Sequence, residues 1–231
     1  MITAPLPLNE AERLAILRRF EILDTPAEPL FDDIATVAAT ICDTPIALIT
    51  LVDEGRQWFK ARIGLEGSET SRDEAFCAHA ILDSAVMQVP DATRDRRFED
   101  NPYVTGEPSV RFYAGAPLDV GDGVRLGTLC VIDRQPRQLT ARQEAALQAL
   151  SRQVVALLEH RRVAADLASA LERVRTLSGL LPICAYCKKV REDDAYWTSV
   201  ESYVRARADV QFSHGICPSC AEAHWGEYLK D

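Results

Sequence analysis

The stretch RFYAGAPLDVGDGVRLGTLCVID, residues 111–133, decides the fold of this chain. Gly121-Asp122-Gly123 lies at its centre, and such triplets are typical of tight turns between antiparallel strands. The flanking residues, 111–120 and 124–132, are mainly apolar and include β-branched side chains. The stretch therefore predicts a β-hairpin, and with it an antiparallel sheet.

The residues before this hairpin predict helices and further strands of the same domain. Asn9 followed by Glu12 is a capping-box pattern that opens the first helix. Leu30, Ile34 and Val37 recur at helical spacing in the second. The expected elements are helices over 10–20 and 29–42, a hairpin of 46–52 and 57–63, a helix over 71–82, a strand over 86–89 and a charged loop over 90–108.

A helix of nearly 40 residues, 139–178, is predicted after the hairpin. Thr140 and Gln143 again form a capping-box pattern. Two runs of apolar residues follow, and the step from Leu157 to Val163 breaks the repeat between them, which changes local winding. We expect the first half to pack on the sheet and the second half to pair with a partner helix. The alternative is one amphipathic helix that folds back on its own domain.

Five short motifs carry a family resemblance. They are FCAH at 76–79, VPDA at 89–92, RFEDNP at 97–102, RFYAGAPL at 111–118 and LGTLCVID at 126–133. Together with the order of elements, they resemble the GAF sensor domains of bacterial histidine kinases and diguanylate cyclases. The resemblance implies an α+β fold over 9–138, after an N-terminal extension of residues 1–8, with an antiparallel sheet flanked by helices. It also implies dimerisation through terminal helices and a pocket for a small ligand such as a cyclic nucleotide, haem, another tetrapyrrole or an amino-acid derivative.

Candidate ligand-binding residues lie on the expected strands and on the 71–82 helix. They are Trp58, Cys77, His79, Arg111 and Tyr113. Side chains two residues apart on a helix point in directions about 200° apart around its axis. Cys77 and His79 should therefore face different surroundings. His79 is either a haem ligand or a hydrogen-bonded structural histidine. Arg111 could reach an anionic ligand. Strand alternation places Trp58 and Phe59 on opposite faces of the sheet.

An enzymatic alternative rests on the three cysteines of the region that resembles a GAF domain. Free methionine-R-sulfoxide reductases are similar in fold and use a cysteine relay, and this chain has Cys42, Cys77 and Cys130. Cys42 ends a helix and Cys130 lies within an apolar strand, so both are expected to be small buried hydrophobes. The sequence shows no Ser/His/Asp set, no Walker loop and no paired catalytic carboxylates. We therefore expect a protein without catalysis.

The last quarter of the chain holds two Cys-x-x-Cys pairs, Cys184/Cys187 and Cys217/Cys220. Four thiolates can enclose one Zn²⁺ at about 2.3 Å, which predicts a zinc-binding module over 179–231. His214 makes a Cys₃His set an alternative, and an iron–sulfur cluster or a redox dithiol pair are others. Val200 and Val204, with Trp197, predict an amphipathic helix between the pairs. This tail is similar to a short Cys-rich module that ends some bacterial sensor and receiver proteins.

Charge and cysteine usage narrow the class of protein. The formal net charge of −9 argues against nucleic-acid binding. No apolar run approaches a membrane span, and no leader pattern precedes Pro5 and Pro7. Seven cysteines with clustered pairs favour a reducing compartment, the cytoplasm.

These observations predict a cytoplasmic bacterial signalling protein. It would be a homodimer that senses a small molecule or redox state. Rearrangement of the long helix would pass that state through the zinc-stabilised tail to a downstream protein that the sequence does not identify. The alternatives are a haem- or tetrapyrrole-binding protein, and a thiol-based redox sensor or sulfoxide-reductase-like enzyme.

Overall fold

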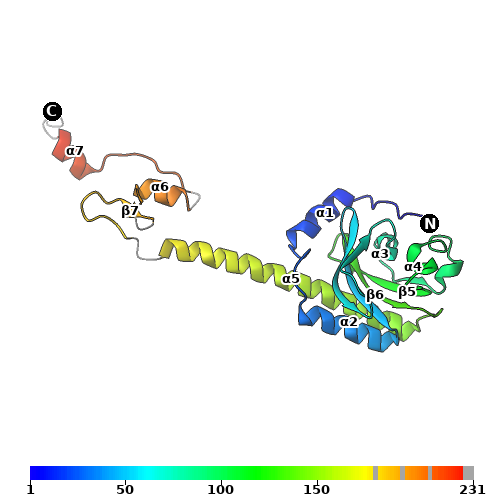
Figure 1. The fold of residues 1–231 in the computed structure, drawn as a ribbon. Coiled ribbons are helices and arrows are strands. Elements are labelled where there is room, and N and C mark those ends of the chain that lie inside the picture. The colour runs from blue at the N-terminus through cyan, green and yellow to red at the C-terminus, as the bar shows by residue number, and fades with distance from the viewer. Residues whose placement is uncertain (179–181, 193–195, 208–209, 226–231) are drawn as a thin grey trace. The chain divides into compact units, whose positions relative to one another are not determined.

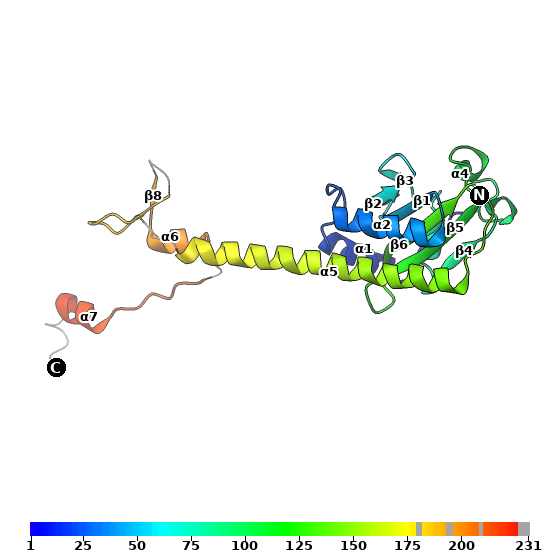
Figure 2. The same cartoon turned by 90° about the horizontal axis from the view of Figure 1, so that it is seen from below.

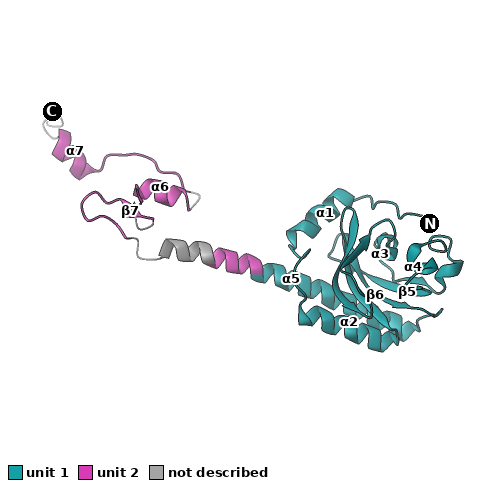
Figure 3. Cartoon of the chain, in the orientation of Figure 1, with its two compact units in different colours: residues 1–164 teal, residues 165–231 magenta. Residues whose placement is uncertain are grey.

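The chain forms two compact units, residues 1–164 and 165–231 (Figure 3). The computed structural model describes all residues except 179–181, 193–195, 208–209 and 226–231, and it describes the backbone but not the side chains of 172–178. The boundary between the units falls within the long helix α5, Ala141–Ser178. The two units are therefore described separately.

The first unit is built on a six-stranded antiparallel sheet (Figure 1). Its strand order is β3-β2-β1-β6-β5-β4. The strands are β1 Ile46–Val52, β2 Arg56–Ile63, β3 Glu69–Ser71, β4 Met87–Val89, β5 Phe112–Asp119 and β6 Arg125–Asp133. Central strand β1 is buried along its whole length, which explains why its sequence is apolar rather than alternating.

Three helices cover one face of this sheet (Figure 2). They are α1 Glu10–Arg19, α2 Pro29–Cys42 and the first half of α5. Pro29 occupies the first turn of α2, where its missing N–H costs nothing, and Asp43 ends that helix in the left-handed region. Leu147 and Val154 of α5 are fully buried in this helical layer.

Smaller elements cover the other face. They are α3 Phe76–Ala80, the 3₁₀ turn Ala92–Arg94 and α4 Pro102–Thr105. Phe76 of α3 stacks on Phe98, with ring centroids 3.9 Å apart. These elements pack on Leu48, Tyr113 and other side chains of the sheet in a second apolar core.

Two ion-pair networks, each with at least one buried partner, tie the helical layer to the rest of the unit. Glu10 of α1 binds both Arg13 and Arg72, at 2.8 and 2.6 Å. Lys60 of β2 has a fully buried side chain, and its Nζ lies 2.6 Å from Glu28. Breaking such a pair leaves an uncompensated buried charge, so both networks tie distant segments together.

The second unit contains short elements after α5. They are β7 Val190–Arg191, β8 Trp197–Thr198, α6 Val200–Arg205 and α7 Pro218–Trp225. β7 and β8 form a small antiparallel pair. Ser199 caps α6, because its Oγ accepts from the Ser202 amide at 3.1 Å.

Most of the predicted elements are confirmed, including both hairpins and the long helix. The Thr140–Gln143 capping box is also confirmed, since the Gln143 side chain accepts from the Thr140 amide at 3.0 Å. The Asn9 capping box is wrong: within the described chain the Asn9 side chain caps no amide, and its Nδ2 lies 3.5 Å from the Gly123 carbonyl.

Three other boundaries differ from the prediction. The 71–82 helix is confined to Phe76–Ala80, because 69–71 pair with β2 as a strand. Trp197 lies in β8, so the helix of the tail begins only at Val200. The 90–108 loop contains a 3₁₀ turn and the short helix α4, for which Asn101 is the cap.

Candidate functional site

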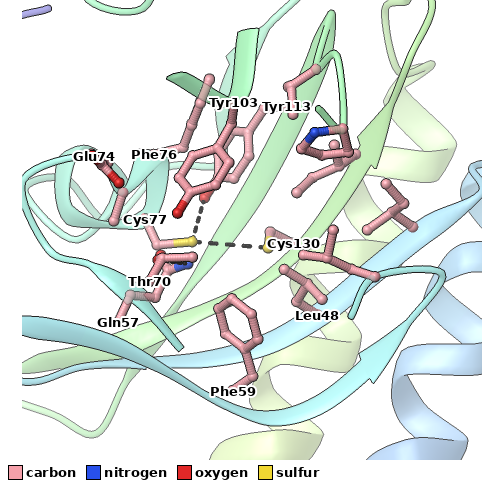
Figure 4. A pocket seen from close by; sticks show the side chains of 16 residues that line it. Leu48, Gln57, Phe59, Thr70, Glu74, Phe76, Cys77, Tyr103, Tyr113 and Cys130 are labelled. Carbon is pink, nitrogen blue, oxygen red and sulfur yellow. Dashed lines mark hydrogen bonds between the residues drawn. The ribbon is translucent and has the colours of Figure 1, made fainter. Parts of the chain in front are cut away.

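A cavity of about 50 Å³ lies on the α3 side of the sheet (Figure 4). Its walls come from five strands, from α3 and from the segment that contains α4. Apolar side chains dominate, among them Leu48 and Phe59 from the sheet and Val110 from the segment after α4. The cavity therefore suits a small and largely apolar group.

Cys77 lies at the centre of the polar part of this cavity. The Thr128 hydroxyl donates to its sulfur at 3.0 Å, and the Tyr113 hydroxyl donates at 3.3 Å. The sulfur of Cys130, on β6, lies 3.9 Å from that of Cys77 (Figure 4). The Thr50 hydroxyl extends the cluster, 3.2 Å from that of Thr128.

Gly115 explains how the Tyr113 hydroxyl reaches Cys77. The two residues are separated by one position on β5, so both lie on the same face of the sheet. A Cβ at position 115 would lie 2.2 Å from the Tyr113 hydroxyl oxygen. Only glycine leaves that space open, so the position of the Tyr113 hydroxyl requires glycine at position 115.

Gln57 contributes a polar group without a partner. Its Nε2 donates to the Thr70 hydroxyl at 3.3 Å, but its buried Oε1 has no hydrogen-bond partner among the described residues. Gln57 is only 6% exposed. A buried acceptor left unpaired costs roughly 1–3 kcal/mol, so a donor inside the cavity would be stabilised there.

The cavity perturbs the acidity of the groups around it. Burial alone would raise the pKa of the Cys77 thiol, but hydrogen bonds from Cys130, Thr128, Thr50 and Tyr113 more than offset it and hold the pKa below its usual value. The hydrogen bond with Cys77, together with burial, raises the pKa of Cys130. Burial, followed by the proximity of Glu74, raises the pKa of Tyr103 at the side of the cavity. Cys77 is thus the thiol most easily ionised in this core.

The structure brings together two of the five predicted ligand-binding residues. Cys77 and Tyr113 line the cavity, and Trp58, His79 and Arg111 do not. Trp58 packs in the core beneath the helical layer, whereas Phe59 lines the cavity. The two side chains lie on opposite faces of the sheet, as strand alternation predicted. Whether the lining residues bind a ligand stays a prediction.

His79 and Arg111 bind backbone groups instead. Nε2 of His79 lies 3.0 Å from the Ile2 carbonyl oxygen, so the ring faces the N-terminal segment, away from Cys77. The guanidinium of Arg111 donates to the Val104 carbonyl at 2.9 Å and thereby holds α4. The expected divergence of Cys77 and His79 is confirmed.

The predicted site omitted most of the residues that line the cavity, among them Gln57 and Cys130. Cys130 is fully buried, as expected, but it also faces Cys77. The strand register explains this position. Cys130 pairs with Leu48 and Gly115, so its side chain lies on the same face of the sheet as that of Tyr113. Cys42 has no such position and lies in the helical core.

The two Cys-x-x-Cys pairs of the tail have different local structures: Cys184 and Cys187 lie at a turn, and Cys217 and Cys220 lie at the start of α7. Backbone amides of Cys187 and Tyr186 donate to the sulfur of Cys184 and lower its pKa. The Ser219 hydroxyl and the Cys220 amide lower the pKa of Cys217 to about 7. In the part of the chain that the structure describes, no three potential metal ligands are gathered, so the two pairs are not brought to one point.

The chain belongs to the GAF domain family, whose model matches residues 26–158. It is 49% identical over 157 residues to cyclic di-GMP phosphodiesterase PA2567 of Pseudomonas aeruginosa. That match covers 68% of this chain and 27% of the relative, so the chain spans about a quarter of the length of this relative.

Two solved GAF domains share the fold. One, from a phosphoenolpyruvate-protein phosphotransferase of Coxiella burnetii, has a TM-score of 0.52 and 17% identity, covering 68% of this chain and 98% of its own. The other, from an Acinetobacter phosphoenolpyruvate-protein phosphotransferase, has a TM-score of 0.50 and 20% identity, covering 68% and 97%. No described helix is both long and apolar enough to cross a membrane.

Proposed function

We propose that this chain is a bacterial sensory module without catalysis, in which the cavity beneath α3 binds a small molecule. Membership of the GAF family supports a regulatory role. The buried Oε1 of Gln57 carries the proposal, because Gln57 lines the cavity and this oxygen finds no partner in the described chain. The ligand is then small and mainly apolar, with one N–H or O–H group directed at Gln57.

The dimensions of the cavity favour such a ligand over haem or another tetrapyrrole. An apolar cavity of about 150 Å³ holds benzene, and this one measures about 50 Å³. His79, the candidate haem ligand, faces the Ile2 carbonyl. A larger ligand would require α3 or the α4 segment to move outward.

The output proposed for the sensor is the second half of α5. Val163, Leu167 and Leu171 are 55%, 58% and 55% exposed and recur every four residues, which gives one apolar stripe. A second copy of this helix would cover that stripe in a homodimer. The change of repeat between Leu157 and Val163 is the point at which ligand binding would alter helix pairing.

The tail is proposed to bind zinc through Cys184, Cys187, Cys217 and Cys220. Four thiols are a donor set that Zn²⁺ prefers, and the lowered pKa values of Cys184 and Cys217 fit ligands that bind as thiolates. Such sites often form only when the metal binds, so gathering of the pairs and metal binding would be one event. The folded tail would then contact a partner protein in the cytoplasm.

The Pseudomonas relative is named for hydrolysis of cyclic di-GMP, and this chain matches 27% of it. We assign regulation to the matched region. This chain would exert that regulation on a separate partner protein, through the tail.

Native mass spectrometry of the purified full chain tests the ligand proposal. We expect wild-type protein to carry a small molecule, Gln57→Leu to lose most of it, and Trp58→Phe, on the opposite face, to retain it. Absence of added mass from the wild type, together with no change in Tm on adding bacterial metabolite extract, would contradict the proposal.

Sedimentation of the full chain tests the dimer. A Leu167→Glu, Leu171→Glu double variant should be monomeric where the wild type is dimeric. Gln153→Glu, at an exposed position outside the stripe, serves as the control. A double variant that stays dimeric rules out the stripe as the interface.

A further inference from the structure

Two thiols from distant parts of the chain meet in the cavity. Cys77 lies in the first turn of α3 and Cys130 lies within β6, 53 residues later, yet their sulfurs are 3.9 Å apart. Both side chains line the same cavity, as Figure 4 shows. Cys42, the remaining cysteine of the first unit, packs in the core on the opposite face of the sheet.

The surroundings of the two sulfurs are unequal. Cys77 accepts from the Thr128 and Tyr113 hydroxyls, which stabilise a negative sulfur. Cys130 lies mid-strand among apolar side chains. Cys77 is thus the thiol suited to act as the nucleophile. Cys130 lies close enough to react with the oxidised Cys77 sulfur, as a pair that forms a disulfide requires.

We propose that Cys77 and Cys130 form a disulfide when a hydroperoxide enters the cavity. The cavity of about 50 Å³ has room for a molecule the size of hydrogen peroxide beside the sulfurs. The proposal goes beyond ligand sensing, since it concerns the thiols themselves, and its test requires no ligand.

The reaction balances with hydrogen peroxide as oxidant. The Cys77 thiolate attacks one peroxide oxygen, the O–O bond breaks, and the departing hydroxide takes the thiol proton to become water. The product is Cys77 sulfenic acid. The Cys130 sulfur then attacks the Cys77 sulfur, the S–O bond breaks, and hydroxide leaves with the Cys130 proton as a second water. Two thiols and one peroxide give one disulfide and two waters.

The bond would change the shape of the cavity. A disulfide requires the sulfurs to approach to about 2.05 Å, so they must close by roughly 2 Å. Because α3 is a single short helix and β6 is central in the sheet, α3 is the element expected to shift. Oxidation would thereby draw α3 against the sheet and reduce the space beside Gln57.

Peptide mapping of the intact chain tests the pair. Trypsin places Cys77 in 73–94 and Cys130 in 126–134, while Cys42 lies in 20–56, so each thiol is read separately from the others and from the tail. The reduced full chain is treated with one equivalent of hydrogen peroxide and unreacted thiols are then alkylated in denaturant. We expect the linked peptides 73–94 and 126–134 to appear, and Cys42 to be oxidised at least roughly tenfold more slowly.

Variants separate the two roles. Cys130→Ser should stop the reaction at a Cys77 sulfenic acid that dimedone traps, and Cys42→Ser should behave as the wild type. The wild-type map alone decides the matter if a variant does not fold. The proposal is overturned if Cys77 and Cys130 both remain alkylatable, or if Cys42 is oxidised as fast as Cys77. It is also overturned if Cys77 is oxidised in the wild type without linkage to Cys130.

Discussion

The two units of this chain differ in what stabilises them. Residues 1–164 contain apolar cores on both faces of a six-stranded sheet. Among the described residues of 165–231, Val190 is the one buried hydrophobic side chain. Tyr186, Ile216 and Trp225 of that unit are 96%, 62% and 47% exposed.

The difference indicates that the two units depend on different interactions. A unit with two apolar cores gains enough from burial to fold alone, whereas a segment of about 50 residues with little buried area usually needs a metal or a partner. The four tail cysteines lie in the segment that lacks a core. The predictions below test this contrast between burial and metal binding.

The largest effect is expected from removing a tail cysteine. Cys217→Ser should abolish stoichiometric zinc binding and the protease resistance of the tail, because structural zinc sites contribute about 10–16 kcal/mol to folding. The Tm of the GAF domain should not change. Elemental analysis and limited proteolysis measure the outcome, and Ser219→Ala is the matched control. A variant that keeps its zinc would exclude the four-cysteine site.

A smaller effect is expected from one substitution made at two positions of α5. Leu147 is fully buried and Leu167 is 58% exposed. Leu147→Ala should lower the free energy of unfolding by about 2–5 kcal/mol, and Leu167→Ala in a dilute monomer by about 0.5 kcal/mol or less. Urea denaturation gives both values. Equal losses would show that the second half of the helix is covered as well as the first.

Acid should weaken the Glu10 network selectively. Burial alone would raise the pKa of Glu10, but hydrogen bonds and the charges of Arg13 and Arg72 lower it to about 2. A carboxylate with a lowered folded-state pKa stabilises the protein above its unfolded value, near 4.5, and loses that contribution as pH falls toward 2.

The Glu10→Gln variant measures this contribution. It should be less stable than the wild type by roughly 1.5–3 kcal/mol at pH 6–7, and the difference should shrink from pH 4.5 downward. Exposed Glu12→Gln is the control. Denaturation at several pH values gives the comparison, and a difference that persists unchanged at pH 2 would exclude the ion-pair explanation.

The smallest effect compares helix caps in the two units. Thr140 caps α5 and Ser199 caps α6. Thr140→Ala should cost about 1 kcal/mol and lower the Tm of the GAF domain by roughly 2–4 °C. Ser199→Ala should leave that Tm unchanged. Calorimetry distinguishes the two, and a GAF Tm that follows Ser199 would mean that the units unfold together.

Local patterns in the sequence were sufficient for the elements that depend on neighbouring residues. The Gly121–Gly123 turn and the Thr140–Gln143 cap involve contacts within a few residues, and both are confirmed. The strand 46–52 is confirmed as well, because its continuous apolar run is by itself typical of a buried strand. The predicted start of the 71–82 helix is wrong, because residues distant in the sequence hold 69–71 in an extended conformation. Ser71 pairs with Arg56 across the sheet, and the Arg72 side chain binds Glu10 and the Asp53 carbonyl.

The candidate site was less predictable, because its residues are far apart in the sequence and meet only in the folded domain. Cys77 and Tyr113 were identified through the family motifs, and both line the cavity. Gln57 lies outside these motifs, and Cys130 lies within the LGTLCVID motif but was expected only to be a small buried hydrophobe. Their importance comes from strand pairing, which places them beside Cys77, and from burial that leaves Gln57 Oε1 unpaired in the described structure.

Hydrogen exchange of the intact chain, with and without a zinc chelator, tests the contrast between the units most directly. We predict that amides of β1, β5 and β6 exchange slowly in both conditions. Amides of α6 and of the two Cys-x-x-Cys segments should be protected only while zinc is bound. Tail protection that survives complete metal removal, or loss of protection in the sheet on chelation, would contradict the account.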